Sequence, residues 1–172
     1  MKTKILIIII FLIVSIALAS YYFWKNDYKD WITYNTTEFD MSFKYPSNWN
    51  MHWGLGTVID DDKRIIVSDT PGESIDLRVG ETLVAFEVYP NKESNTVNNI
   101  ISCKDIGEVK LIECGEDKIG GTLFKKQIMV NRNVNKTLSM AAIQNGKLYQ
   151  IEVFGDVYNQ IAKKMIKSVL LK

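Results

Sequence analysis

The first 24 residues divide this chain into an apolar segment and a part that can fold in water. No charged side chain occurs from Ile5 to Trp24, after the basic start Met1-Lys-Thr-Lys4. A helix rises about 1.5 Å per residue, so this stretch would be roughly 30 Å long, the thickness of a bilayer's hydrocarbon core. The aromatic residues that end it stand where an interfacial belt is expected. We therefore predict a signal anchor, that is, a transmembrane helix within residues 1–24.

A cleaved signal peptide is the alternative for the same segment. Ala17-Leu18-Ala19 fits the small-x-small cleavage rule. Both interpretations send the rest of the chain out of the cytoplasm. The prediction is a single-pass protein of the cell membrane with its C-terminal domain outside, or a secreted domain after cleavage near Ala19.

The charge balance excludes one class of partner. The chain has 21 basic and 20 acidic residues. The predicted anchor holds two lysines and no acid, which leaves 19 basic against 20 acidic residues in the remainder. A nucleic-acid-binding protein needs a basic field. No nucleic acid is therefore predicted as a partner.

Alternating apolar side chains predict an antiparallel sheet after a stalk or N-terminal strand at residues 25–37. Met41, Phe43 and Tyr45 face one way and their neighbours the other, as in a half-buried strand. Asn145-Gly146 is the strongest hairpin signal and pairs residues 138–143 with 148–154. Further strands are predicted at 49–53, 64–68, 75–79, 83–89, 109–113 (followed by a turn at Cys114-Gly115) and from Gly121 to Val130.

Two helices accompany these strands. A short one is predicted after Ser94 or Asn95, with Val97, Ile100 and Ile101 on one face and its exit at Gly107. A last helix, capped by Asp156, carries an apolar stripe of Val157, Ile161, Met165 and Val169, widened by Ile166 and Leu170. The stripe favours a core-facing helix over one lying on a membrane. The fold class is therefore α+β, with helices packed on an antiparallel β-sheet.

Three features together resemble the PsbP-like superfamily. They are Phe43-Lys-Tyr-Pro-Ser-Asn-Trp49, the Gly120-Gly121 entry to a long strand, and a closing hairpin followed by a helix with Ser168 near its end. The resemblance covers about residues 38–172. It implies an α/β/α sandwich around an antiparallel sheet, without a shared catalytic centre, and known members mostly bind proteins or help to assemble complexes. No functional residue of the family carries over to a position here.

Few residues qualify as site candidates. Tyr45, Trp49 and Trp53 are a candidate partner surface, because Trp and Tyr supply contact area at low entropic cost. We favour a structural role for this corner, in which the aromatic side chains seal one end of the core. Asp60-Asp61-Asp62 could attract a cation such as Ca²⁺, but the alternating Asp-x-Asp-x-Asp-Gly pattern of a Ca²⁺ loop is absent and the charges of Lys63 and Arg64 offset the acids, so we expect a solvated turn.

Cys103 and Cys114 are the only cysteines, and two interpretations stay open. Outside the cytoplasm a disulfide is expected. By closing this loop it would stabilise the folded state by about 2–3 kcal/mol. Two buried free thiols are the alternative. A metal site built from these cysteines and the lone His52 lacks ligands at useful spacing, so no metal and no cofactor is predicted.

The sequence contains no motif of a known enzyme class: no Gly-x-Ser-x-Gly elbow, no phosphate loop and no His-Glu-x-x-His. Only a carboxylate pair that meets in three dimensions would escape this search. We therefore predict a non-enzymatic, membrane-anchored domain outside the cytoplasm that binds another envelope protein or helps to assemble a complex. The alternative is a small-ligand or ion-binding module with a cleft at the sheet, and an extracytoplasmic hydrolase is a distant third.

Overall fold

The computed structural model describes residues 9–16, 18, 28–37, 39–53, 63–69, 81–91, 96–131 and 136–172 of the 172 in the chain. The chain separates into two compact units, Met1–Trp31 and Ile32–Lys172. In the first unit, residues 9–16 and 18 are helical and their large apolar side chains are exposed. Within the described residues, no helix has the length and apolar character needed to cross a bilayer. The other residues of the predicted anchor lie outside the described ranges.

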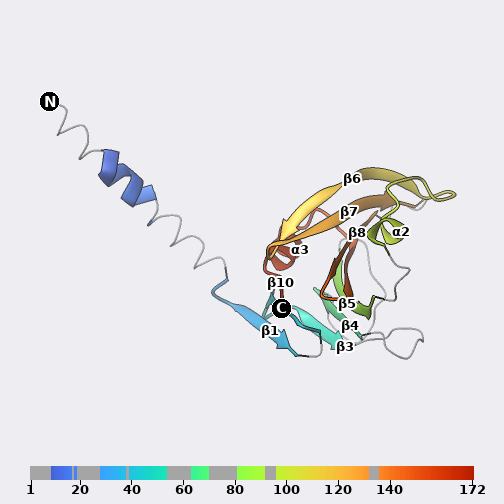
Figure 1. Ribbon diagram of the computed structural model, residues 1–172. Coiled ribbons are helices and arrows are strands. Elements are labelled where there is room, and N and C mark those ends of the chain that lie inside the picture. Colours follow the sequence, from blue (N-terminus) through green and yellow to red (C-terminus); the bar gives the residue numbers. More distant parts are fainter. Residues whose placement is uncertain are drawn as a thin grey trace. The chain divides into compact units, whose positions relative to one another are not determined.

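Ten strands and two helices make up the described part of the second unit, with β1 starting at its border (Figure 1). Seven strands form one sheet, in which every pairing is antiparallel. Its order is β3 (Asn50–Trp53), β4 (Lys63–Ser68), β5 (Thr82–Pro90), β9 (Lys147–Gly155), β8 (Lys136–Gln144), β7 (Thr122–Val130) and β6 (Lys110–Ile119). A smaller sheet holds β1 (Trp31–Thr36), β2 (Met41–Pro46) and β10 (Leu170–Leu171), and the helices are α2 (Val97–Ile100) and α3 (Gln160–Lys167).

The central hairpin forms at the predicted turn. Gln144 pairs with Lys147, and the two residues between them, Asn145 and Gly146, have φ angles of +50° and +71°. These are the positive φ angles that a two-residue type I′ turn requires and that Asn and Gly tolerate best. The prediction of β8 and β9 is confirmed, and these two strands occupy the middle of the sheet.

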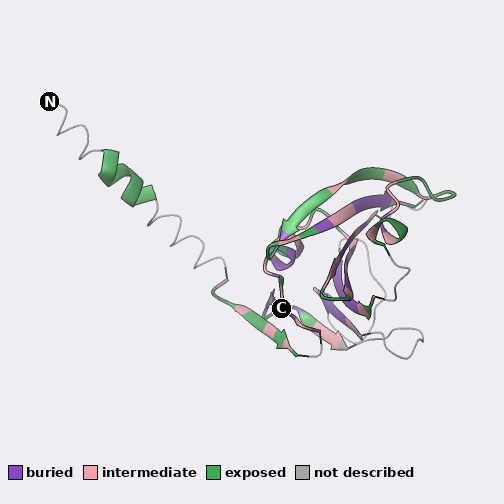
Figure 2. Cartoon of the chain, viewed as in Figure 1, coloured by how far each residue is buried: buried purple, intermediate pink, exposed green. Residues whose placement is uncertain are grey.

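The face of the large sheet that meets β2 and α3 holds the main core. Phe43 of β2 stacks on Phe86 of β5, with ring centroids 4.1 Å apart. Met165 of α3 is fully buried, and Ile151 and Val153 of β9 are at most 1% exposed. Figure 2 shows this burial as a purple band over β4, β5 and β9, whereas β6 is largely green. We call this surface the α3 face.

The opposite surface of the sheet packs against α2, and we call it the α2 face. Ile101 lies in a buried cluster with Ala141 and Leu148, and Val97 and Ile100 pack against it. The helices thus lie on opposite faces of an antiparallel sheet, as predicted. The predicted fold is correct in this respect, although α2 is a single turn that ends at Ile100 and does not reach Gly107.

The three features that carried the family resemblance meet at one corner. The Lys44 backbone N–H donates to Ser168 Oγ over 2.8 Å, which ties β2 to the end of α3. The next residue, Val169, approaches Gly120 so closely that a Cβ there would lie 2.5 Å from the Val169 carbonyl oxygen. This corner explains the signature by packing, because a side chain at Gly120 would separate the β6–β7 hairpin from the chain after α3.

Some predicted boundaries were wrong, and local chemistry explains each. Cys114 and Gly115 lie inside β6 and not in a turn. The strand has a bulge between Leu111 and Glu113, after which its pairing with β7 continues through both residues. Asn159, not Asp156, caps α3: its Oδ1 accepts from the N–H groups of Ile161 and Ala162. Asp156 accepts from the Tyr158 N–H and forms the turn before the helix.

The apolar stripe of the last helix also needs correction. Because α3 starts at Gln160, its buried residues are Ala162, Met165 and Ile166, at the i, i+3 and i+4 positions of one face. Ile161 lies off that face and is 38% exposed. Leu170 leaves the helix, pairs with Ser42 as part of β10 and is 56% exposed. The predicted strand at 75–79 and the acidic turn at 60–62 lie outside the described residues.

Candidate functional site

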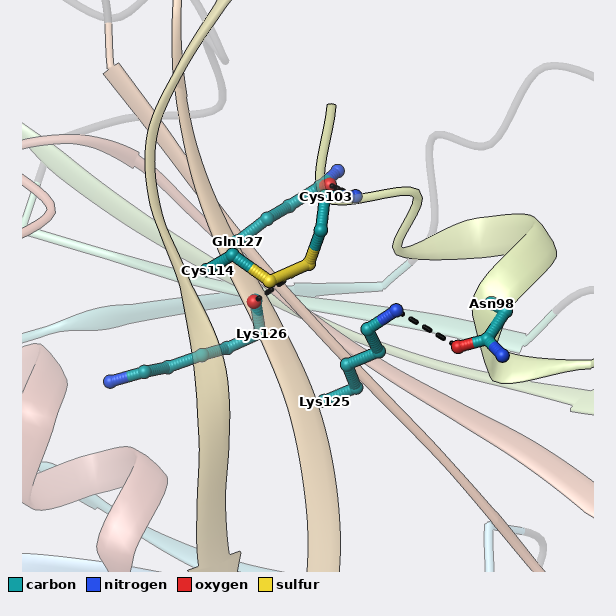
Figure 3. The surroundings of a disulfide bond; sticks show 6 residues. All are labelled: Asn98, Cys103, Cys114, Lys125, Lys126 and Gln127. Carbon is teal, nitrogen blue, oxygen red and sulfur yellow. Dashed lines mark hydrogen bonds between the residues drawn. A yellow bond between two sulfur atoms is a disulfide. The ribbon is translucent and has the colours of Figure 1, made fainter. Parts of the chain in front are cut away.

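A disulfide holds the segment after α2 against the edge of the large sheet (Figure 3). The sulfur atoms of Cys103 and Cys114 are 1.96 Å apart and the Cα atoms 5.6 Å apart. The Cys103 N–H donates to the Gln127 side-chain oxygen over 3.1 Å, and Lys125 Nζ donates to Asn98 Oδ1 over 2.9 Å. The connection between α2 and β6 is therefore fastened to both β6 and β7.

Strand β6 is an edge strand whose outer side pairs with no other described strand. Its start is partly covered, since Asp105 accepts from the Leu111 N–H and from Lys110 Nζ, each over 2.9 Å. These donors, Lys110 first, hold the pKa of the Asp105 carboxyl below its usual value. Beyond the bulge, the six residues Cys114–Ile119 pair in register with β7 and leave their other side open.

Ion pairs join the edge strand β6 to its neighbour β7. Lys126 of β7 reaches Glu113 at 3.0 Å and Asp117 at 3.1 Å, both on β6. The hydrogen bond to Glu113, more than that to Asp117, raises the pKa of Lys126. Large apolar side chains remain exposed nearby, Ile112 at 46% and Leu123 at 59%. The edge presents backbone groups to solvent, with Ile112 near the start of β6 and Leu123 of β7 opposite Lys118 near its end.

A cleft lies on the α3 face, between α3 and strands β6 to β8. Its volume is about 290 Å³. Its apolar lining comes from Ile119, Ile128, Leu138, Met140, Val157 and Ile166. Lysines and two carboxylates surround this apolar lining. The sequence alone did not mark this cleft, because its lining comes from five separate segments.

The α2 face carries a group of charges that sequence reasoning had left unresolved. Arg64 Nε lies 2.5 Å from Glu87 Oε1, and Arg64 Nη2 lies 3.5 Å from Glu152 Oε2. The Tyr89 hydroxyl donates to the other oxygen of Glu87. Burial, and then the charge of Glu87, raise the pKa of Glu152, while Arg64 and a hydrogen bond from Ser139 act the other way.

This group is a carboxylate pair of the kind that a sequence cannot exclude. The Glu87 side chain is only 8% exposed, and its two oxygens contact Arg64 and Tyr89. Among the described residues, Arg64, Tyr89 and Ser139 contact these carboxylates. The ion pairs of Arg64 link β4 to β5 and β9.

Two of the three aromatic residues singled out from the sequence are buried: Tyr45 is 8% exposed and Trp49 is 6% exposed. This burial favours the structural role over the partner surface for these two residues. The side chain of Trp53 lies outside the described residues. His52 is half-buried on β3, and no group of three or more metal-ligating side chains occurs in the described ranges.

Comparison with known proteins bears on the fold. No protein-family model matches the sequence, and no curated protein matches it. Among solved structures, the chain is similar to cyanobacterial PsbP (CyanoP) from Synechocystis, with a TM-score of 0.55 and 14% identity. That match covers 83% of this chain and 93% of the CyanoP chain. The fold is PsbP-like.

A second similar structure is a protein from Bacteroides thetaiotaomicron, with a TM-score of 0.47 and 11% identity over 81% of this chain and 48% of that one. The PsbP-like fold confirms the resemblance that rested on the Phe43–Trp49 stretch, Gly120-Gly121 and Ser168. Those residues meet at a packed corner, which explains why they identify the fold.

Proposed function

We propose that this chain is a membrane-anchored, extracytoplasmic and non-enzymatic PsbP-like accessory domain that binds another envelope protein along the β6 edge. The observation that carries the proposal is the open outer side of β6, with exposed apolar residues toward its two ends, Ile112 on β6 and Leu123 on the neighbouring β7. An extended segment of a partner can add to such an edge as a further strand. The resemblance agrees, since PsbP-like proteins mostly bind proteins or help to assemble complexes.

The construction of this edge favours a specific partner over self-association. Charged residues and a bulge are the usual protection of an edge strand against indiscriminate pairing, and β6 has both. The disulfide and the Lys126 ion pairs fix the strand before a partner arrives. A fixed edge loses little conformational entropy on binding, which favours affinity.

Co-purification tests the partner. The intact chain, extracted in mild detergent, is expected to retain a stoichiometric envelope protein, and the pair Ile112→Lys and Leu123→Lys is expected to abolish that retention. Ile32→Lys on β1 is the matched control, because Ile32 is 45% exposed and lies outside the edge. A chain that purifies alone, or a partner that survives the double change, contradicts the proposal.

Fractionation tests the anchor. We expect the intact N-terminus to stay with membranes through high-salt and carbonate washes, and the domain to be cut by protease added outside the cell. A mature chain that begins at Ser20 and is released by salt shows that the apolar segment is a cleaved signal peptide.

A further inference from the structure

The cleft on the α3 face has the shape and charge of a small-ligand site. Pairing in register brings Ile128, Leu138 and Met140 onto the same face of β7 and β8, because Ile128 lies opposite Leu138 and residues two apart share a face. Ile166 of α3 closes the cleft from the other side. The result is an apolar floor under a helix, which is the usual construction of a ligand pocket.

The charges around this floor are unequal. Three lysines and two carboxylates have side chains on the cleft face, so the net charge there is +1, because alternation along β6 turns the Lys118 side chain to the other face. Lys126 pairs with both carboxylates, Glu113 and Asp117. The other two lysines, Lys163 and Lys167, have no carboxylate partner among the described residues. An anion at the rim is therefore favoured.

One wall of the cleft concentrates this positive charge. The ammonium group of Lys163 lies 5.4 Å from the centre of the Tyr158 ring, and that of Lys136 lies 5.0 Å from it. Contact with an aromatic ring holds a lysine near the surface without neutralising its charge. Lys163 thus stays at the mouth of the cleft, one turn of α3 before Lys167.

We propose that this cleft binds a medium-chain aliphatic carboxylate, with the chain on the apolar floor and the carboxylate at Lys163 and Lys167. The size agrees: since a water molecule takes up about 30 Å³ in the liquid, a cleft of about 290 Å³ accepts roughly ten non-hydrogen atoms, as in octanoate. Neutral or cationic molecules of the same length lack the attraction of the lysines. The cleft shares Glu113, Asp117 and Ile119 with β6, but the proposed head-group contacts lie on α3, so the Lys163 and Lys167 variants test this proposal apart from the β6 edge.

Methyl resonances of methionine give a direct test on the full chain in lipid nanodiscs, where no detergent competes. Octanoate is expected to produce a saturable shift of the Met140 methyl signal. Met129 is the internal control, because it is 7% exposed and alternation along β7 places it on the α2 face. Octylamine and octanol enter lipid as octanoate does. Neither is expected to produce a saturable shift of the Met140 methyl signal.

Charge variants test the assignment of the head group. Changing Lys163→Ala and Lys167→Ala together is expected to weaken octanoate binding at least about tenfold, as expected for loss of charge-assisted hydrogen bonds. Lys104→Ala, on an exposed residue outside the cleft, is the control and leaves the affinity unchanged. The proposal is overturned by a Met140 signal that does not respond, by equal binding of octanol or octylamine, or by an unchanged affinity of the double variant.

Discussion

A single carboxyl on the α2 face has a measurable effect on the pH dependence of stability. Burial raises the pKa of Glu152 above its ordinary value of 4.5, so the folded state holds this proton more tightly than the unfolded chain. Folding stability therefore falls as the pH rises from about 4.5 through the raised pKa of the folded state. Above that range the charged carboxylate is a persistent cost.

Glu152→Gln removes this cost and keeps an oxygen for Arg64. We expect the midpoint temperature of the variant to exceed that of the original chain at pH 7–8, and the difference to disappear below pH 4. Thermal unfolding over a pH series measures it. Glu116→Gln on the exposed face of β6 is the control; a similar gain there would show that total charge, not the environment of Glu152, causes the effect.

Alanine variants of two adjacent glycines at the β6–β7 turn would distinguish the cost of backbone strain from the cost of steric overlap. Both have positive φ, +55° at Gly120 and +92° at Gly121, but only a Cβ at Gly120 would collide with the Val169 carbonyl oxygen. Gly121→Ala is expected to cost roughly 1–2 kcal/mol through strain. Gly120→Ala is expected to cost about 1–3 kcal/mol more, since the chain after α3 must move.

Urea denaturation of the two glycine variants measures this difference. Equal losses would mean that the corner between Gly120 and Val169 does not constrain the fold.

At the scale of elements, sequence patterns predicted the strands well where one period dominates. Met41, Phe43 and Tyr45 alternate and are all buried, and Asn145-Gly146 supplies its own turn geometry. Patterns failed where two local signals competed. Cys114-Gly115 has the composition of a turn, yet pairing with β7 carries the strand through it.

The candidate sites were harder to predict than the fold. The cleft and the edge each depend on strands that are distant in sequence, and neither leaves a local motif. The pairing of Cys103 with Cys114 stayed open in the sequence, because it depends on how the chain returns from α2 to β6.

The disulfide is the element that we expect to matter most for the β6 edge. Its two cysteines are 11 positions apart in the sequence, and its loss in the double variant Cys103→Ser and Cys114→Ser should lower the free energy of unfolding by about 2–3 kcal/mol. Hydrogen exchange should rise mainly in residues 101–114. Two thiols that alkylate without reductant in the intact chain would refute the bond.

At the scale of the whole molecule, three parts of the domain differ in construction. Packing closes the corner around Ser168, ion pairs of Arg64 link strands on the α2 face, and the outer side of β6 pairs with no described strand, which is why we propose it as the partner site. Such a division suits an accessory domain, since a rigid sheet presents one edge while its core stays closed. The central claim is that this edge meets another envelope protein.

Cross-linking in living cells tests that claim most directly. A photoreactive amino acid replaces Ile112 in one strain and Ile32 in another, two positions of nearly equal exposure. Irradiation is expected to join the chain to one envelope protein from position 112 and not from position 32. No adduct at position 112, or the same adducts from both positions, would contradict it.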